Sequence, residues 1–177
     1  MRNILRSYFQ MISPEEHLRA GDVDVPVRLE RANGCPNSFY RYLYVEVGRG
    51  FHWIDRLPWT DQQIADHLND RSVSLWVLYS GGVPAGYFEL KKRPEDGSVE
   101  IAYFGLLPEF HGHGLGKWLL SQAVDQAWEI GAKRIWLHTC TLDHPAAIPN
   151  YVARGFRLFK QETYQIEGPG GGDGAGQ

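Results

Sequence analysis

The spacing of apolar residues along the chain predicts two helices in its first third. In the stretch 38–47 (SFYRYLYVEV), apolar side chains recur every three or four positions, which is the period of one helix face. The stretch 60–70 (TDQQIADHLND) begins at Thr60, whose side chain suits the free N–H groups of a first helical turn. We therefore expect two helices before the main run of strands.

Three strand-like runs come next, at residues 72–80, 83–91 and 98–107. Each is rich in β-branched and aromatic residues, and the turn sequences GG and PEDG separate them. Because turns this short join neighbouring antiparallel strands, the pattern predicts a three-stranded meander.

The following part of the chain alternates helices with strands. An amphipathic helix is expected from about residue 115, with Gly131 as its stop, and a strand follows at 134–142. A strand, a helix and a strand in this order imply a parallel crossover, so the sheet would be mixed. A short helix within 146–154 and a strand from Phe156 complete the predicted α/β fold.

The length of 177 residues suits one domain, which we expect to occupy residues 1–167 with a core from about 25 to 166. Residues 168–177 (GPGGGDGAGQ) contain hardly any side chain that could be buried, and they predict a flexible tail. Pro149 fits the last helix only if that helix kinks or begins near Ile148, because an interior proline removes a hydrogen bond.

Composition narrows the class of partner. A net charge of −3 argues against a surface that neutralises nucleic-acid phosphates, and 13% aromatic residues favour a pocketed protein. No apolar run is long enough to span a bilayer, and charge interrupts the N-terminus too early for a signal peptide. We expect a cytoplasmic monomer or homodimer that binds neither nucleic acid nor membrane. Two cysteines are too few for a disulfide framework.

A glycine-rich junction precedes the long helix, in the sequence PEFHGHGLGKW (108–118). Glycines at a helix start let a phosphate reach the unpaired backbone N–H groups at the positive end of the helix dipole. The spacing does not match the dinucleotide fingerprint, and the Gly116-Lys117 pair precedes Trp118 rather than the Ser or Thr of a P-loop.

The spacing His111-x-x-Gly114-x-Gly116 resembles the acyl-CoA loop Q/R-x-x-G-x-G/A of the GCN5-related N-acetyltransferases (GNATs). A second signature of that superfamily, about 30 residues further on, is matched by His144, Ala147, Tyr151, Gly155 and Phe156. Histidine stands at positions 111 and 144 where the family has Gln or Arg and Asn, respectively. The order of the predicted elements is also the order found in this family.

The resemblance implies a mixed, centrally splayed sheet flanked by helices. It also implies transfer of the acetyl group from acetyl-CoA to a primary amine of a small molecule or peptide, by direct attack with general-base assistance. A different class stays open: a CoA-binding sensor or partner domain of the same fold that does not turn the cofactor over.

The family pattern assigns the cofactor site residue by residue. Leu106 and Leu107 would pair with the pantetheine arm at the splayed end of their strand. The pyrophosphate would lie on the loop, and the acyl-CoA contacts would include His144; the loop residues are His111, Gly112, His113, Gly114, Leu115, Gly116 and Lys117.

For the general base, the resemblance points to Glu100. By simple alternation Glu100 would share a strand face with Ala102, Phe104 and Leu106, and so with the pantetheine site. Glu89 on the preceding strand is the alternative base, and His138 is a candidate for a proton relay through water.

Tyr151 would act as the acid for the departing thiolate. Its alternative role is that of a core tyrosine.

Two further clusters carry alternative interpretations. His138, Cys140, Asp143 and His144 lie close together in sequence, but they lack the spacing of a zinc site, so we predict no metal. The segment 48–63 borders the acceptor site in the family, and its aromatic and acidic residues would suit an amine or would simply pin the helices; they are Phe51, His52, Trp53, Asp55, Trp59 and Asp61.

Overall fold

The computed structural model describes residues 2–166. Seven strands make one sheet: β1 (Arg2–Met11), β2 (Val27–Arg31), β3 (Val73–Ser80), β4 (Val83–Arg93), β5 (Ser98–Leu106), β6 (Arg134–Cys140) and β7 (Arg157–Ile166). The α-helices are α1 (Asn37–Val47), α2 (Asp61–Asn69), α3 (Leu115–Glu129) and α4 (Ala147–Ala153), and two 3-10 turns lie at Pro14–Glu16 and Pro108–Phe110. The predicted tail, 168–177, lies outside the described residues.

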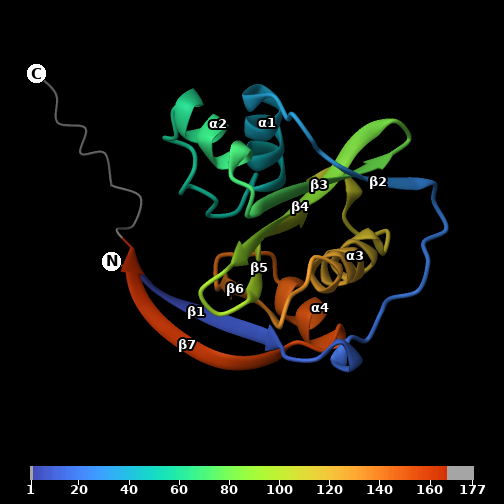
Figure 1. The fold of residues 1–177 in the computed structure, drawn as a ribbon, viewed down its shortest axis with the longest axis vertical. Helices are drawn as coiled ribbons and strands as arrows, with labels where there is room; N and C mark the ends of the chain where they lie inside the picture. The colour runs from blue at the N-terminus through green and yellow to red at the C-terminus, as the bar shows by residue number, and fades with distance from the viewer. Residues whose placement is uncertain (1, 167–177) are drawn as a thin grey trace, which may run out of the picture.

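The sheet is mixed and splayed at its centre, as expected. Its strand order is β2-β3-β4-β5-β6-β1-β7, and β5 and β6 are its parallel pair. These two strands pair only from Ser98–Arg134 to Glu100–Trp136. Beyond that point they diverge, so the second half of each strand leaves its facing backbone edge free (Figure 1).

The first strand was not expected from the sequence. β1 lies between β6 and β7 and is antiparallel to both, and Figure 1 shows β1 and β7 as a long curved pair. Alternate residues Ser7, Phe9 and Met11 are buried in the same core as α3. A period of two is therefore present in residues 7–11, but it is short, and one of its three buried positions is a serine. β2, at the opposite edge of the sheet, was also missed.

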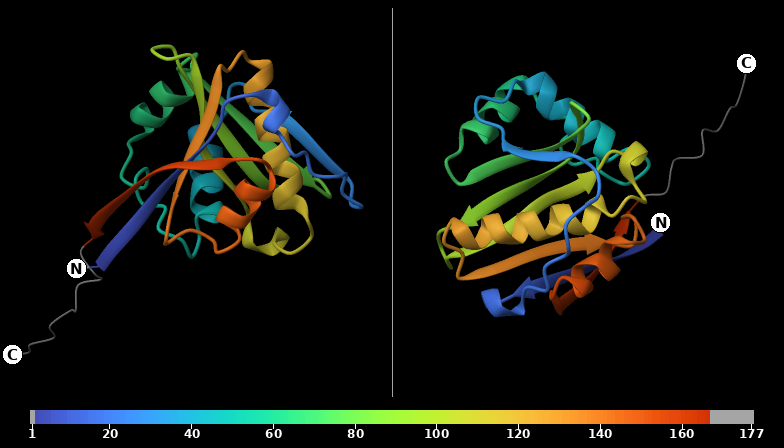
Figure 2. Two further views of the ribbon diagram at one scale, coloured as in Figure 1. Left: turned by 90° about the horizontal axis from the view of Figure 1, so that it is seen from below. Right: turned by 90° about the vertical axis from the view of Figure 1, so that its right-hand side faces the viewer.

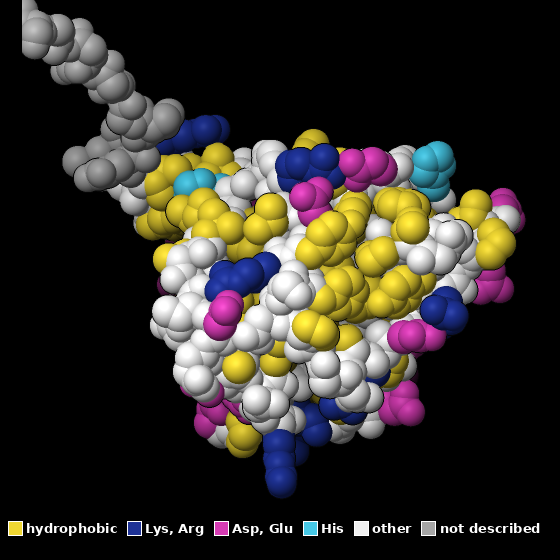
Figure 3. Space-filling model, turned by 90° about the horizontal axis from the view of Figure 1, so that it is seen from above, with side chains coloured by type: hydrophobic (Ala, Val, Ile, Leu, Met, Phe, Trp, Pro, Cys, Tyr) yellow, Lys and Arg dark blue, Asp and Glu magenta, His cyan; other side chains and the backbone are white. Residues whose placement is uncertain are grey.

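Helices cover both faces of the sheet. α1 and α2 pack on one face, in a cluster with Leu75, Tyr87 and Leu107, whereas α3 and α4 pack on the other face (Figure 2). On the outside, apolar side chains gather in the view from above in Figure 3, with basic and acidic side chains at their rim. No helix in residues 2–166 has the length and apolar character to cross a bilayer.

Local sequence explains where these helices begin and end. Thr60 accepts a hydrogen bond from the Gln63 N–H at 3.2 Å, and the Gln63 side chain accepts one from the Thr60 N–H at 2.8 Å. Gly131, with φ of 92°, follows the end of α3 as expected. Because α4 begins at Ala147, Pro149 lies in its first turn, where its missing N–H has no helical partner to lose.

A bulge in β5 overturns the simple alternation expected for this strand. Glu89 pairs with Tyr103 and Leu90 with Ile101, which leaves Ala102 as an extra residue. Beyond the bulge the faces exchange, so Glu100 lies on the α1–α2 face with Tyr103. Phe104 and Leu106 pack instead in the core beneath α3. The prediction that Glu100 shares a face with Phe104 and Leu106 is therefore wrong.

Candidate active site

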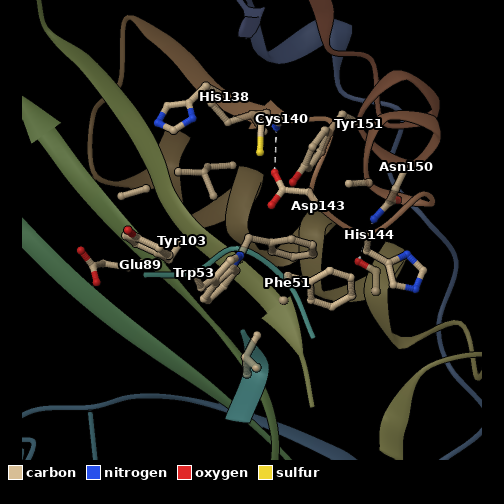
Figure 4. A pocket seen from close by; sticks show the side chains of 18 of the residues that line it. Phe51, Trp53, Glu89, Tyr103, His138, Cys140, Asp143, His144, Asn150 and Tyr151 are labelled. Carbon is tan, nitrogen blue, oxygen red and sulfur yellow. Dashed lines mark hydrogen bonds between the residues drawn. The ribbon is translucent and has the colours of Figure 1, made fainter. Parts of the chain in front are cut away.

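A cavity of about 960 Å³ occupies the region where β5 and β6 separate. Its lining comes from the segment between α1 and α2, from β4, β5 and β6, from the first turn of α3 and from α4. Residues of β1 and β7 complete it at the far end. Figure 4 shows the side chains of both walls converging on this space.

The loop before α3 presents a row of unpaired backbone donors. Within the described chain, no hydrogen bond is donated by the backbone N–H groups of residues 112–117. Gly112 and Gly114 have φ of 83° and 75°, a left-handed backbone that glycine adopts without strain. These N–H groups lie at the positive end of a 15-residue helix, so both the geometry and the dipole of the loop suit an anion.

The two unusual histidines tie this loop to its surroundings. His111 Nε2 lies 3.2 Å from the Leu106 carbonyl oxygen, and its ring packs edge-on against His144 at 4.8 Å between centroids. His144 Nδ1 accepts a hydrogen bond from the Ala146 N–H at 3.0 Å, which holds the turn before α4. A further contact, from the Asn150 amide to the Gly116 carbonyl at 3.2 Å, joins α4 to α3.

The two expected pantetheine residues differ in how free their backbones are. Leu107 donates its N–H to the Ala85 carbonyl at 2.8 Å, and its own carbonyl accepts from Phe110 at 2.9 Å. Leu106 lines the cavity, whereas Leu107 packs in the α1–α2 core. Of the pair, Leu106 is therefore the one beside the cavity.

Glu100 lies at the point where β5 and β6 part. Its side chain lines the cavity although the residue is only 6% exposed. It accepts a hydrogen bond from Arg93, and its other oxygen lies 4.0 Å from His138 Nε2. His138 is the more exposed of the two, at 39% of its side chain. Burial lowers the pKa of His138, and the charge of Arg6 lowers it further, so this imidazole is neutral near pH 7.

Glu89 has a different environment. Its carboxylate is fully buried, and Arg56 donates to both of its oxygens, at 2.7 and 3.0 Å. His67 Nε2 and the Tyr40 hydroxyl approach to 2.7 and 2.9 Å. Burial alone would raise the pKa of Glu89, but the contacts with His67 and Arg56 outweigh it and lower the pKa to about 2. These four contacts use the lone pairs of both Glu89 oxygens, so the carboxylate has no lone pair left to face a substrate.

Tyr151 reaches the cavity from α4. The residue is 7% exposed, and in Figure 4 its phenol and the carboxylate of Asp143 point toward each other. Asp143 is held in place by the Thr139 hydroxyl at 2.5 Å and the Cys140 N–H at 2.9 Å. Burial raises the pKa of Tyr151, and the charge of Asp143 raises it further. The phenol is therefore a donor that stays protonated.

The aromatic segment between α1 and α2 divides between core and cavity. Trp59 does not line the cavity, and it packs on His67 at 5.2 Å and beneath the Arg56 guanidinium at 4.8 Å. Trp53 contacts Tyr103 at 5.0 Å and also lines the cavity. Phe51, His52 and Asp55 line it as well, whereas Asp61 pairs with Arg41 outside it.

The cysteine and histidine cluster at the end of β6 does not converge as metal ligands would. His138, Cys140, Asp143 and His144 all line the cavity, but among residues 2–166 no group of three His, Cys, Asp or Glu side chains is placed to hold an ion. One oxygen of Asp143, Oδ2, instead accepts hydrogen bonds from the Thr139 hydroxyl and the Cys140 N–H.

The central part of the sequence matches a known family. Residues 37–156 fit the profile of the Acetyltransferase (GNAT) family. The chain belongs to the GNAT family. The match contains the diverging strands, the glycine loop and α4, and therefore every candidate site residue named so far from the sequence. β1 and β7 of this GNAT domain lie outside it.

Relatives agree with this assignment. An uncharacterised N-acetyltransferase of Mycobacterium tuberculosis is 28% identical over 104 residues, which are 59% of this GNAT chain and 65% of the relative. The match thus covers slightly less than two thirds of the relative's length. A GCN5-related N-acetyltransferase from Sphaerobacter thermophilus superposes with a TM-score of 0.68 at 14% identity, covering 89% of this chain and 49% of its own. A Bacillus subtilis acetyltransferase solved in complex with CoA has a TM-score of 0.57 at 22% identity, covering 75% and 77%.

Several residues of this GNAT site were not found by sequence reasoning. Arg93 contacts Glu100 across two strands, and Arg56 neutralises Glu89 from a loop 33 positions away. Arg6 reaches the cavity from β1. In the sequence, each of these arginines looks like any other surface arginine. Only folding brings it to the site, so the neighbouring residues do not indicate its role.

Proposed function

We propose that this chain is an N-acetyltransferase that moves the acetyl group of acetyl-CoA onto a primary amine. One observation carries the proposal: the loop 112–117, whose backbone N–H groups are unpaired in the part of the chain that the structure describes, borders the cavity between the diverging strands through Gly112, Gly116 and Lys117. Phosphates need such donors, and an extended thioester arm needs a free strand edge. The Bacillus subtilis structure of the same fold, which contains CoA, supports this choice of ligand.

The cofactor side of the site would be formed by backbone more than by side chains. The amides of residues 112–117 would bind the pyrophosphate, with Lys117, which lines the cavity, adding positive charge. Leu106 would pair with the pantetheine arm along its free edge. His111 and His144 would act by fixing the loop, because their rings contact one another and the loop's own backbone.

The acceptor side would lie on the α1–α2 face, where the bulge in β5 places Glu100. Acetyl-CoA supplies an acyl group activated as a thioester. Glu100 would take a proton from the protonated amine. The neutral nitrogen would then bond to the acetyl carbon as the carbon–sulfur bond breaks, and the second proton lost by the nitrogen would reach the sulfur, so that CoA leaves as the thiol. Tyr151 would donate a hydrogen bond to the departing sulfur from the opposite wall, and its raised pKa keeps that proton in place.

The proposal is tested by mixing the protein with acetyl-CoA and a panel of primary amines while free thiol is measured. Release of CoA that depends on both an amine and the protein, with the acetylated amine identified by mass spectrometry, is the expected result. Tight CoA binding by calorimetry without turnover of any amine would instead show a sensor or partner domain. Absence of CoA binding would reject the proposal altogether.

A first variant tests the glycine loop. Gly114→Asn should weaken CoA binding about 100-fold, because the new side chain blocks phosphate access to two or more charge-assisted N–H contacts of about 1.5–3 kcal/mol each. Asparagine tolerates the left-handed backbone, and the nearest neighbour of a Cβ here is the flexible end of Lys117, at 3.3 Å. Calorimetry with CoA measures the affinity.

The matched control for this variant is Gly131→Asn at the other end of α3. Gly131 also has a left-handed backbone, with φ of 92°, and open space around it. Gly131→Asn should lower the free energy of unfolding by a similar amount and leave the affinity for CoA unchanged. Equal affinities for Gly114→Asn and the parent would remove the loop from the cofactor site.

A second variant tests the hydrogen bond that Tyr151 would donate to the departing sulfur. Tyr151→Phe should lower kcat about 10- to 100-fold, since one hydrogen bond to a charged group is worth about 1.5–3 kcal/mol, and leave the affinity for CoA nearly unchanged. The dependence on the leaving group separates this role from a packing role. With an acyl donor whose thiol is more acidic, the kcat of Tyr151→Phe should lie closer to that of the parent. If the ratio of parent to variant kcat is the same for all acyl donors, Tyr151 has only a packing role in the core.

A further inference from the structure

The cations on the α1–α2 side of the cavity are nearly all paired with carboxylates. Arg56 contacts Glu89 at 2.7 Å, and Lys91 contacts Asp70 at 2.5 Å. Arg93 pairs with Glu100. Each of these positive charges is neutralised within the protein, so none is left to recognise an anion.

Arg6 on β1 has no such partner in the described part of the chain. It lines the same cavity, yet within residues 2–166 no carboxylate lies within ion-pair distance of it. Its Nε is buried without a hydrogen-bond partner, and its guanidinium lies 4.7 Å from the centre of the Tyr164 ring. Because that Nε is enclosed by protein, a ligand in the cavity would meet the terminal nitrogens of the guanidinium.

The carboxylate opposite Arg6 in the sheet is engaged elsewhere. Glu162 pairs with Arg6 in register, but it accepts a hydrogen bond from the Tyr8 hydroxyl at 2.7 Å and contacts Lys160 at 2.5 Å. The β1–β7 edge of the cavity therefore keeps one positive charge that its own neighbours do not neutralise.

Arg6 also lies close to the proposed base. Its strand pairs with β6 so that Arg6 faces Cys140 and Tyr8 faces His138. The charge of Arg6 contributes to the lowered pKa of His138, and His138 lies 4.0 Å from Glu100. Asp55, which has no ion-pair partner among the described residues, lines the same space. Arg6, which has no ion pair in residues 2–166, thus lines the same cavity as the carboxylates of Glu100, which Arg93 contacts, and Asp55.

We propose that the acceptor is an amine that also bears a carboxylate, and that Arg6 binds this carboxylate. A planar guanidinium recognises a carboxylate through two parallel hydrogen bonds, which also fixes the direction of the rest of the molecule. The ammonium end then lies toward Glu100 and Asp55. Free amino acids and short peptides with a nearby carboxylate belong to this class. The inference rests on the proposed acetyl transfer and adds the class of its acceptor.

The recognising residue comes from outside the part of the chain that matches the family. The family match begins at residue 37, whereas Arg6 belongs to the strand that fills the gap between β6 and β7. The acceptor preference is therefore a property of this chain's own β1.

The test compares acceptors that differ only in the carboxylate. Amino acids, their amides and their decarboxylated amines, for example leucine, leucinamide and 3-methylbutylamine, are assayed with acetyl-CoA by thiol release and mass spectrometry. The parent should favour the carboxylate member at least 10-fold in kcat/KM. Because amides and amines differ from amino acids in basicity, rates are compared at equal concentrations of the neutral amine.

Variants then assign the preference to one side chain. Arg6→Gln should abolish the preference for the carboxylate acceptor. The KM for that acceptor should rise about 10- to 100-fold, as expected for the loss of a bidentate charged contact. The neutral amines should change little. Arg6→Lys should restore part of the preference, and Arg2→Gln, on the same strand but outside the cavity, should behave as the parent.

The outcomes separate this inference from the proposed function. Turnover of amines with no advantage for the carboxylate overturns the role of Arg6 and leaves the acetyltransferase proposal intact. A carboxylate preference that survives Arg6→Gln assigns recognition to another residue and likewise overturns it. No turnover of any amine rejects the proposed function itself. The acceptor comparison in the parent keeps the test decisive even if Arg6→Gln unfolds.

Discussion

Replacing Glu100 by glutamine should lower kcat for amine acetylation by about 10²- to 10⁴-fold near neutral pH, the usual contribution of a positioned general base. At this pH the amine is mostly protonated, so attack on the thioester requires removal of a proton. As the pH rises, solvent deprotonates the amine and the deficit should shrink. Steady-state rates from pH 6 to 10 measure this dependence.

Controls distinguish a base from a structural glutamate. Gln keeps an oxygen that can accept from Arg93, so the melting temperature of Glu100→Gln should stay close to that of the parent. Glu129→Gln, at the exposed end of α3, is a charge-matched control that should leave the rate unchanged. If Glu100→Gln retains parent rates across the pH range, the base is not Glu100, and neutral His138 becomes the group to replace.

Breaking the buried ion pair beside the site should cost about 3–5 kcal/mol of the free energy of unfolding, because Glu89→Gln leaves the Arg56 charge without its partner. For a chain of this size that lowers the melting temperature by roughly 10 °C or more. The amine KM should also rise, since Arg56 anchors the segment that carries Trp53 and Asp55 along the cavity. Urea unfolding and steady-state kinetics measure the two effects.

The same pair predicts how stability depends on pH. The pKa of Glu89 is lowered to about 2 in the folded chain, below the ordinary value of 4.5. A lowered pKa means that its contribution is fully present above about pH 4.5 and is lost as the pH falls toward 2. The stability difference between parent and Glu89→Gln should therefore narrow over this interval. Glu95→Gln, on the exposed turn before β5, should show no such change, and a constant difference for Glu89 would contradict the lowered pKa.

A double replacement tests whether the cost comes from the stranded charge. Arg56→Met combined with Glu89→Leu removes both charges and keeps apolar volume, so it should recover much of the stability lost by Glu89→Gln. The amine KM should stay raised, because the segment between α1 and α2 has still lost its anchor.

The sequence by itself determined the central elements and the glycine loop, because these depend on local chemistry. Thr60 and Gln63 cap α2 within one turn, Gly114 adopts a backbone conformation that favours glycine, and hydrophobic periodicity fixed α3. Such features need no distant partner, so they can be inferred from neighbouring residues alone. The order of helices and strands from α1 to β7 followed in the same way, and with it the mixed sheet, whereas the splayed centre was implied by the resemblance to the GNAT family.

Only the tertiary structure decided which way the reactive groups face. A single extra residue, Ala102, turns Glu100 to the α1–α2 side, since a shift of one position exchanges the two faces of a strand. The pairing of β1 between β6 and β7 brings Arg6 to the cavity that Glu100, 94 positions further along the chain, also lines. Arg56 likewise neutralises Glu89 only through folding. These contacts depend on how distant segments align with one another, and the pattern of neighbouring residues does not determine that alignment.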